Sequence, residues 1–451
     1  MPGILAAIMQ LVFATWTAFS LIFAGILGAL VGSFANVVIF RVPAGRSIVF
    51  PGSSCPNCGY RLQPLDLVPI FSWLALGRRC RKCHMPISAR YPSIELLMAV
   101  GFVVLVWRFP ILLFGSSVLP LLALYAMLVM MSMIDVDHYL LPDSLTLPAL
   151  VVGVLGAFLY EPMSGLPTVS EAMFGAIFAA GCLALINRLG SLVMRRFQDT
   201  QERLFPIGMD QVNVAALFGA LGGVWVGIGA AVVSVIVNII TKRTVRLPEP
   251  LLYGLWLLAI ILLIWQPLVG LQAGLLGTAA AAGALSILGA AYWWGMELAG
   301  KVEPIDSTSV DSTSVNSTSA DSTSADSISV DSTSADQTQA NVADEAIAPS
   351  SERDVAPESN IDTTDPAADE PIAMGFGDVK LAAVLGAFLG WELALVALFL
   401  SFIIGAIGGI ISRIAAGSKL IPFGPYLTIA GLLSLFIGRP LLAWYLNLLG
   451  F

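Results

Sequence analysis

Residues 117–138 read SVLPLLALYAMLVMMSMIDVDH. The first part, 117–134, carries no charge and is about 18 residues long, the length of a candidate transmembrane helix. Asp135 follows without a break, so we expect its carboxyl group to remain at membrane depth. An ionisable side chain is costly there and is by default a functional residue. The stretch therefore predicts a membrane-spanning helix that ends on a functional carboxylate.

The composition of the whole chain agrees with this interpretation. Of its 451 residues, 57% are apolar and only 12% are charged, whereas soluble domains are about 45–50% apolar and about 25% charged. No ten-residue stretches of alternating character indicate a membrane barrel, so the spanning segments must be helices. The predicted fold is an all-α polytopic membrane protein, a helix bundle in the lipid bilayer.

Twelve apolar segments indicate crossings of the membrane, although two of them are short for a full span. They lie at 12–40, 92–107, 117–134, 144–160, 171–190, 212–224, 226–241, 250–268, 271–295, 379–391, 393–412 and 421–437. Basic residues gather in a few loops, above all in 41–91, and such loops stay in the cytoplasm. We therefore expect a first transmembrane helix within 1–40, followed by a cytoplasmic loop.

A segment of different composition interrupts this pattern. Residues 306–340 repeat a five-residue motif such as DSTSV, and 303–371 hold 16 acidic residues and one basic residue, Arg353. Small polar and acidic residues bury too little apolar surface to offset the entropy lost on folding. We expect a disordered, cytoplasmic acidic insert over 297–372, and favour a spacer over a binding tether.

A second repeat lies within the apolar segments. QVNVAALFGALGG (211–223) aligns without gaps on DVKLAAVLGAFLG (378–390), with six of thirteen residues identical. Upstream, FGAIFAAGCLAL (174–185) resembles LGTAAAAGALSI (276–287). Ordinary packing of small residues is the alternative, since Gly- and Ala-rich helices resemble one another. We favour a degenerate duplicate.

This duplicate differs from its counterpart at two polar positions. Gln211 stands where the second copy has Asp378, and Asn213 stands where it has Lys380. The first copy is therefore expected to be inactive, and the function of the inserted helices is not evident from the residues.

Two Cys-x-x-Cys pairs, CPNC and CRKC, lie in the loop 41–91 and comprise Cys55, Cys58, Cys80 and Cys83. Four thiolates at this spacing suit tetrahedral Zn²⁺. A redox pair is the alternative, but a reducing cytoplasm disfavours disulfides. Four cysteines leave no open coordination position, so we expect a structural zinc ion. His84 is not expected to be a ligand, and Cys182 is expected to be a small core residue.

A second aspartate, Asp378, begins another apolar segment after the glycines of GFGD (375–378). By the predicted topology, Asp135 and Asp378 lie at the same membrane face. Two carboxyl groups brought together can share a proton, so that one donates it and the other activates water, as in aspartic proteolysis. Membrane carboxylates also serve in proton relays, and from the residues alone both hypotheses stand.

Two further aspartates follow Asp135. Asp143 comes after the helix-breaking Pro142 and is expected to cap the next helix, with Ser144 as its first residue. Asp137 is expected to lie in the loop, exposed to solvent. We assign neither of them a catalytic role.

Six blocks, taken in order, resemble the type IV prepilin peptidases, which are bifunctional leader peptidases and N-methyltransferases. They are GSFANVVIFRVP (32–43), the two Cys-x-x-Cys pairs, RYPSIELLMA (90–99), IDVDHYLLPDSLTLP (134–148), GFGDVKLAAVLGAFLGW (375–391) and IPFGPYL (421–427). The Gly-x-Gly-Asp signature of this aspartic intramembrane protease family is present as Gly375-Phe376-Gly377-Asp378. The departure from the family pattern is 191–371, where typical members have a short connector.

The resemblance implies an activity. Carried over by position, the catalytic aspartates are Asp135 and Asp378. It implies an aspartic endopeptidase that cleaves the basic leader of type IV prepilin or pseudopilin precursors at the cytoplasmic side of the bacterial inner (plasma) membrane. It also implies methylation of the new N-terminus with S-adenosylmethionine. The zinc loop is the candidate for organising that step, although the cofactor-binding residues are unknown.

The resemblance also sets the expected partners and domains. Pilus or type II secretion assembly proteins are expected partners, and nucleic acid is not. The expected parts are a first transmembrane helix (1–40), a zinc-binding domain (41–91), helices with the first aspartate (92–190), inserted helices (191–296), the acidic linker (297–372) and helices with the GFGD motif (373–451).

Two other classes of function remain as alternatives. A repeat-containing membrane transporter or proton relay would use Glu95, Asp135 and Asp378, with an inverted repeat and carboxylates at mid-membrane. A zinc-bearing scaffold of a secretion machine would have no activity, and it would best fit a chain that had lost one aspartate.

Overall fold

A computed structural model describes residues 2–193, 206–241, 249–265, 270–300, 375–416 and 422–449. These residues belong to a single unit of helices. Most of the acidic insert predicted over 297–372 lies outside the described residues. Its first two residues continue a helix that ends at Leu298, so the insert begins later than predicted.

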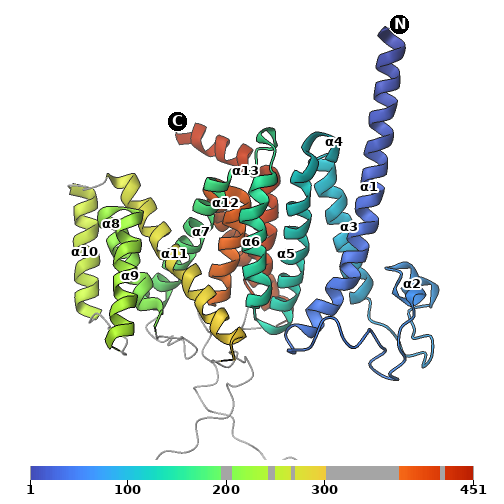
Figure 1. Ribbon diagram of the computed structural model, residues 1–451, viewed down its shortest axis with the longest axis horizontal. Helices are drawn as coiled ribbons and strands as arrows, with labels where there is room; N and C mark the ends of the chain where they lie inside the picture. The colour runs from blue at the N-terminus through green and yellow to red at the C-terminus, as the bar shows by residue number, and fades with distance from the viewer. Residues whose placement is uncertain are drawn as a thin grey trace, which may run out of the picture. The chain divides into compact units, whose positions relative to one another are not determined.

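Most of the described residues are helical. Their only β-type pairings are two isolated β-bridges in the loop 41–91. The main helices are α1 (Pro2–Arg41), α2 (Phe71–Ala75), α3 (Arg90–Arg108), α4 (Ile111–Phe114), α5 (Val118–His138), α6 (Asp143–Gly156), α7 (Val169–Val193), α8 (Met209–Gly222), α9 (Val224–Thr241), α10 (Glu249–Trp265), α11 (Leu271–Leu298), α12 (Phe376–Ala416) and α13 (Gly424–Leu449). Figure 1 shows them as a bundle with the loop 41–91 beside the end of α1.

Eight helical stretches in the described part of the chain are long and apolar enough to cross a membrane. The protein is therefore an all-α, multi-pass membrane protein, as the composition predicted. Each of the twelve predicted segments overlaps a helix, although some extend a few residues beyond the helix ends or the described residues. Three of the corresponding helices, α6, α8 and α10, are shorter than 18 residues, and the segments 379–391 and 393–412 both belong to α12.

Small residues let α1 and α3 approach closely. A Cβ at Gly28 would lie 2.6 Å from the carbonyl oxygen of Met98, and one at Gly32 would lie 2.7 Å from Cα of Glu95. Small residues spaced in this way allow helix backbones to meet in a membrane. The first turn of α3, which follows the loop 41–91, is thereby held against α1.

Helix α12 reverses direction at Gly390, where φ is 74° and ψ is 171°. Its path is shown by three contacts with α13, taken in order along α12: Leu385 with Gly431, Leu393 with Gly438, and Gly408 with Tyr426. The first half of α12 therefore runs alongside α13, and the second half returns. The two predicted crossings at 379–391 and 393–412 correspond to these two halves.

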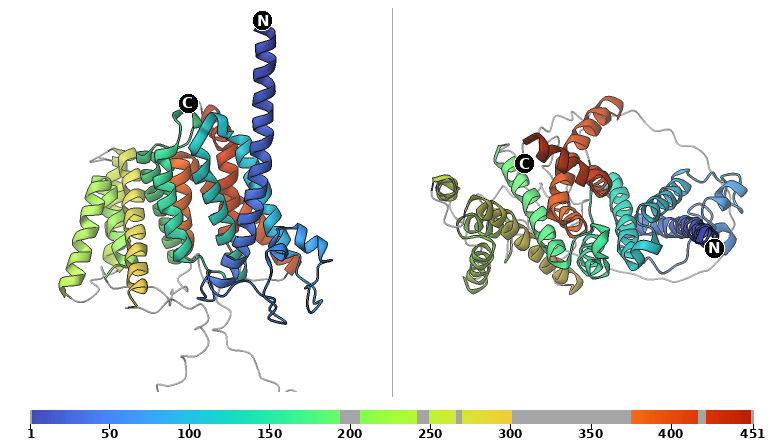
Figure 2. Two further views of the ribbon diagram at one scale, coloured as in Figure 1. Left: turned by 45° about the vertical axis from the view of Figure 1, so that its right-hand side comes forward. Right: turned by 90° about the horizontal axis from the view of Figure 1, so that it is seen from above.

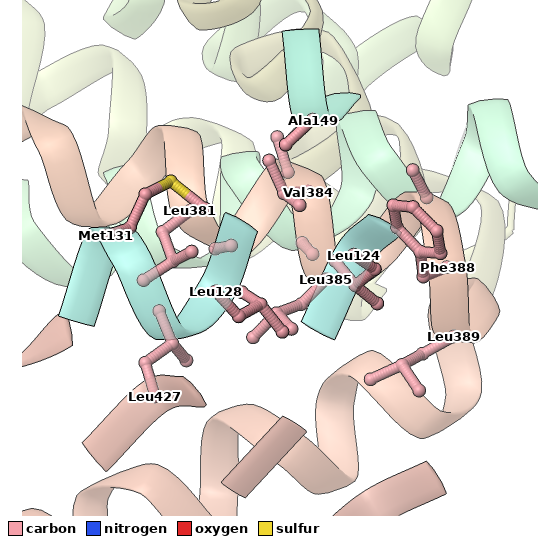
Figure 3. Close-up of a cluster of buried hydrophobic side chains, with 14 of the residues drawn as sticks. Leu124, Leu128, Met131, Ala149, Leu381, Val384, Leu385, Phe388, Leu389 and Leu427 are labelled. Atoms are coloured by element: carbon pink, nitrogen blue, oxygen red, sulfur yellow. The ribbon is translucent and has the colours of Figure 1, made fainter. Parts of the chain in front are cut away.

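The core that positions the site is formed by α5, α12 and α13. Leu128 and Met131 of α5 meet Leu381 of α12 and Leu427 of α13, as Figure 3 shows, and none of these four side chains is exposed. Interiors of this kind are close-packed, so they hold their helices in fixed positions. This cluster lies within one to two helical turns of Asp135 and Asp378.

The inserted helices contact the rest of the bundle mainly through α11, which packs along α7. Figures 1 and 2 place α8, α9 and α10 on the side of α11 that is remote from α1 and α3. The helices with the two aspartates, α5 and α12, lie between these two groups. The insertion therefore leaves the packing of α5, α12 and α13 uninterrupted.

Candidate active site and metal centre

Asp135 lies in the last turn of α5 and is only 6% exposed. Its Oδ2 atom accepts a hydrogen bond of 2.9 Å from the backbone N–H of Gly424, the first residue of α13. A Cβ at residue 424 would lie 2.7 Å from the same oxygen, so any larger residue there would displace the Asp135 carboxyl group. The end of α5 and the start of α13 are therefore fitted to each other through this carboxylate.

Asp378 lies in the first turn of α12 and is 7% exposed. It is close enough to Asp135 for the charge on Asp135 to act on it. Gly377, in the glycine signature, allows this approach: a Cβ there would lie 2.9 Å from the Leu141 side chain, between α5 and α6. Two carboxyl groups from distant parts of the sequence thus lie near each other, both buried.

Lys380 and Asp143 form an ion pair that connects α12 to α6. Lys380 also lies over the ring of Phe376, at 5.3 Å from its centroid. The prediction that Asp143 caps α6 is wrong: α6 begins at Asp143, Pro142 takes the cap position, and no side-chain cap bond forms. The Asp143 carboxylate instead pairs with a lysine of another helix, because Lys380 of α12 lies within its reach.

Asp137 also has a different environment from the one predicted. It pairs with Arg90, the first residue of α3, and its side chain is 26% exposed. Asp137 lies in the last turn of α5 and not in the loop, so that part of the expectation is wrong, whereas its exposure to solvent agrees with the prediction. This pair joins the end of α5, two residues after Asp135, to the point where the loop 41–91 enters the membrane helices.

The role of the Lys380–Asp143 ion pair can be tested by a charge reversal and a second substitution that restores the pair. If the chain cleaves leaders, as the sequence resemblance implies, Lys380→Asp alone should lower that cleavage by more than about tenfold, the effect of about 1.4 kcal/mol, because two carboxylates then repel where α12 must start. Asp143→Lys added to it should restore most of the cleavage, since the pair is re-formed in reverse. Single-turnover cleavage of a precursor measures both. A double variant no better than the single variants would contradict this role.

The four cysteines of the loop converge on one point. Their sulfur atoms all lie within 4.8 Å of one another, with Cys55 Sγ at 3.8 Å from Cys83 Sγ and Cys58 Sγ at 4.0 Å from Cys80 Sγ. Zinc–sulfur bonds of about 2.3 Å in tetrahedral geometry place the sulfurs about 3.8 Å apart. The four residues therefore fit a zinc ion, and His84 is not part of this group.

The two cysteine pairs have the same backbone geometry. Cys55 N–H bonds to the carbonyl of Tyr60, and Cys80 N–H bonds to the carbonyl of Met85, each at 2.9 Å. The residue after the second cysteine of each pair has a positive φ, 66° at Gly59 and 57° at His84. Only a few residue types other than glycine adopt this conformation readily, and histidine is one of them.

Hydrogen bonds and burial give three of the thiols, Cys55, Cys58 and Cys83, different pKa values. The backbone N–H of Met85 lowers the pKa of the Cys83 thiol to about 6, and the N–H groups of Cys58 and Asn57 lower the pKa of Cys55. The pKa of Cys58 rises to about 11: the Tyr60 N–H lowers it, but burial and the neighbouring thiols outweigh that effect. Four thiolates so close together repel one another, so a bound cation is needed to ionise all of them.

Asp66 joins the two cysteine pairs, a contact that the sequence did not predict. It accepts hydrogen bonds from Arg81 Nε (2.8 Å), Gln63 N (3.1 Å) and the Tyr60 hydroxyl (3.3 Å). Burial alone would raise the pKa of Asp66, but Arg81 and Gln63 lower it on balance. Because Arg81 lies between Cys80 and Cys83, the carboxylate fixes one pair relative to the other.

The loop is attached to the membrane helices by a buried carboxylate. Glu95 of α3 is 8% exposed and accepts a hydrogen bond of 2.7 Å from the backbone N–H of Ile70. Trp73 Nε1 bonds to the carbonyl of Ile87 and closes the loop on itself. Glu95, which the transporter hypothesis uses as a proton relay, thus holds the loop 41–91 against α3.

Comparison with known families agrees with this geometry. The chain matches the family described as "Bacterial Peptidase A24 N-terminal domain" over residues 26–109, and the "Type IV leader peptidase family" over 122–242 and 367–410. A protein of Escherichia coli, "Type 4 prepilin-like proteins leader peptide-processing enzyme", is 33% identical over 267 residues, which are 91% of that protein and 52% of this chain. The chain belongs to the type IV leader peptidase family. The resemblance noted from the sequence blocks is therefore confirmed.

Two further relatives carry the description "Prepilin leader peptidase/N-methyltransferase". That of Myxococcus xanthus is 41% identical over 175 residues, and that of Pseudomonas aeruginosa is 33% identical over 221 residues. The matched stretches span 50% and 71% of these relatives, and 39% and 44% of this chain. No solved structure matches the chain.

Proposed function

We propose that this member of the type IV leader peptidase family is an aspartic endopeptidase that removes the leader of type IV prepilin-like precursors, with Asp135 and Asp378 as its catalytic carboxyl groups. The observation that carries the proposal is their position: two buried aspartates, 243 residues apart in the sequence, lie at the ends of α5 and α12, near enough for the charge on Asp135 to act on Asp378. The family membership supplies the substrate class.

The proposed chemistry needs the two carboxyl groups in opposite protonation states. One, ionised, takes a proton from water as the water oxygen attacks the scissile carbonyl carbon, and the other donates its proton to the carbonyl oxygen. The tetrahedral intermediate then collapses and its C–N bond breaks. The leaving amine takes the proton held by the first group, and a hydroxyl of the intermediate returns a proton to the second group as the new carboxyl group forms. The Gly424 N–H orients Asp135 for this exchange.

We also propose that the protein methylates the new N-terminal amine. S-Adenosylmethionine would supply the methyl group, so that its S–CH₃ bond breaks, an N–CH₃ bond forms and the amine loses a proton. Zinc held by Cys55, Cys58, Cys80 and Cys83 would have a structural role. It would keep the loop folded beside α3, where Glu95 and Arg90 attach the loop to the helices. No residue is assigned to S-adenosylmethionine.

The proposed setting is the bacterial inner membrane, with the aspartates and the zinc loop on the cytoplasmic side. The basic residues of 41–91 support this orientation because such loops stay in the cytoplasm. Asp135, Asp378 and the loop lie at the same side of the bundle, since Arg90 pairs with Asp137 next to Asp135. Precursors with basic leaders, and the pilus or secretion assembly that they enter, are the proposed partners.

The proposal is tested with the full chain in membranes and a prepilin-like precursor with a basic leader. Mass spectrometry of the product reads both steps: loss of the leader, and a gain of one methyl group when S-adenosylmethionine is present. Both changes are expected. An intact precursor after prolonged incubation with several such precursors would overturn the peptidase assignment, and a cleaved but unmethylated product would overturn the methylation alone.

A further inference from the structure

Two glycines in different parts of the chain have the same unusual backbone conformation. Gly223, between α8 and α9, has φ 80° and ψ −177°, and Gly390, between the halves of α12, has φ 74° and ψ 171°. In the alignment of 211–223 with 378–390 they occupy the same position. Left-handed φ values are adopted freely only by glycine. The geometry therefore supports the repeat independently of the six identical residues.

The two aligned helices, α12 and α8, also pack on helices that align with each other, α7 and α11. A Cβ on Gly386 of α12 would overlap the carbonyl oxygen of Gly175 in α7 and would lie 2.9 Å from Cβ of Ala179. The α7 and α12 backbones therefore meet directly at this point, because only small residues permit such an approach.

The same contact occurs between α8 and α11, at the aligned positions. A Cβ on Gly219 of α8 would overlap the carbonyl oxygen of Gly277 in α11 and would lie 3.1 Å from Cβ of Ala281. In the two alignments, these three residues are the counterparts of those that join α12 to α7. The pair α11–α8 is therefore a second version of the pair α7–α12.

The two versions meet along a symmetric contact between α7 and α11. Gly181 of α7 lies against the carbonyl of Ala279, and Gly283 of α11 lies against the carbonyl of Ile177. Gly181 aligns with Gly283, and Ile177 aligns with Ala279, so that exchanging the copies interchanges the two contacts. A contact of this kind is what a two-fold axis produces between identical subunits.

The order of helices along the chain shows that the copies have exchanged a helix. By sequence, the first copy is α7 to α10 and the second is α11 to α13. Yet α7 packs extensively on α12 and not on the next helix, α8, while α11 packs extensively on α8 and only slightly on α12. Each copy thus contributes its first helix to the other, as subunits do when they swap domains.

We propose that helices α7–α10 and helices α11–α13 are two copies of one helical module, joined within the chain as a pseudo-dimer whose first helices are exchanged, and that only the second copy carries a peptidase carboxylate. The partner of the α7 surface is therefore a second copy of the module. The exchange of α7 and α11 between the copies does not depend on the proposed peptidase activity. The expected effect of that exchange on leader cleavage does rest on the proposed function.

In the first copy, the residues at the positions of Asp378 and Lys380 do not form a second active site. Gln211, at the position of Asp378, is buried, and its Oε1 accepts a hydrogen bond from the Gly208 N–H. Asn213, at the position of Lys380, is 4% exposed, and its Nδ2 atom has no hydrogen-bond partner within the described residues. The acidic partner of Lys380 is Asp143 of α6, and within the described residues the duplicated module contains no counterpart of α5 or α6.

A cross-linking experiment tests the exchange. Phe178 of α7 contacts Trp391 of α12, with ring centroids 5.9 Å apart, and the counterpart of Phe178 in α11 is Ala280. Two double variants, Phe178→Cys with Trp391→Cys and Ala280→Cys with Trp391→Cys, are made in a Cys182→Ala chain with a protease site inserted in 306–340. After oxidation, denaturation and cleavage, the first pair should keep the two fragments joined, and the second should release them. The opposite result would overturn the exchange.

A deletion tests what the exchange means for the peptidase. Joining α7 directly to α12 through a short Gly/Ser linker removes 194–374, and leaves intact the α7–α12 contact on which Asp378 depends. The shortened chain should still cleave a precursor, and Gln211→Ala in the full chain should leave cleavage unchanged. A shortened chain that inserts in the membrane but cleaves nothing would indicate that α12 needs α11, and not α7, as its packing partner. That result would refute the exchange. Inactivity of both the full and the shortened chain would instead count against the proposed function.

Discussion

Asp135→Asn and Asp378→Asn should each reduce leader cleavage below detection, a loss of at least about 10³-fold, while the protein still inserts in the membrane. General acid and base groups contribute about 10²–10⁴-fold each, and the two roles act as a unit, so removal of either stops the reaction. The substitution keeps the size of each side chain and the hydrogen bond from the Gly424 N–H. Initial rates with one precursor, at equal amounts of inserted protein, measure the effect.

The matched control for these variants is Asp210→Asn. Asp210 lies in the first turn of α8, as Asp378 lies in the first turn of α12, but one residue before the aligned position. It should leave cleavage at the level of the unmodified chain. Normal processing by either Asp135→Asn or Asp378→Asn would contradict the proposed roles of the two aspartates.

Cys55→Ser and Cys80→Ser should each remove the bound zinc and the methylation step, and leave leader cleavage largely in place. A structural site binds zinc with about 10–16 kcal/mol of free energy that also folds the surrounding chain, so the loss of one of four ligands unfolds the loop. The aspartates lie on α5 and α12, outside the loop. Zinc content by elemental analysis and the methyl gain of the product by mass spectrometry read the two effects.

Cys182→Ser serves as the control because Cys182 lies in α7, outside the loop. It should keep the zinc. Methylation that continues in a zinc-free Cys55→Ser protein would show that the loop does not organise this step. Loss of cleavage together with the zinc would show that the loop also supports the peptidase site, through Glu95 or the Arg90–Asp137 pair.

The helical architecture could be predicted because hydropathy and length alone constrain a membrane-spanning chain. All twelve apolar segments overlap helices of the described residues, and the four-cysteine cluster follows directly from its spacing. The reversal at Gly390 could not be seen, since a glycine inside a long apolar run does not reveal its φ value. The predicted segments 379–391 and 393–412 nevertheless correspond to the two halves of α12, although the first is short for a full span.

The contacts around the site could be predicted only in part. The topology predicted that Asp135 and Asp378 lie at the same face. The Lys380–Asp143 pair joins residues 237 positions apart, and the Gly424–Asp135 hydrogen bond uses a backbone group, which has no signature in the sequence. Asp143 and Asp137 were misjudged because local rules for caps and loops ignore charged partners from other helices. Gly424 does lie within the IPFGPYL block, which was the available signal.

The most direct test of the central claim is whether the side chains at 135 and 378 touch. In a Cys182→Ala chain with a protease site in 306–340, Asp135→Cys and Asp378→Cys should be joined by a short bifunctional thiol reagent, so that the two fragments stay together after denaturation and cleavage. A control pair with Asp137→Cys in place of Asp135→Cys should join less readily, because Asp137 faces Arg90. Fragments that separate fully for the 135/378 pair in correctly inserted protein would mean that the two carboxyl groups form no common site.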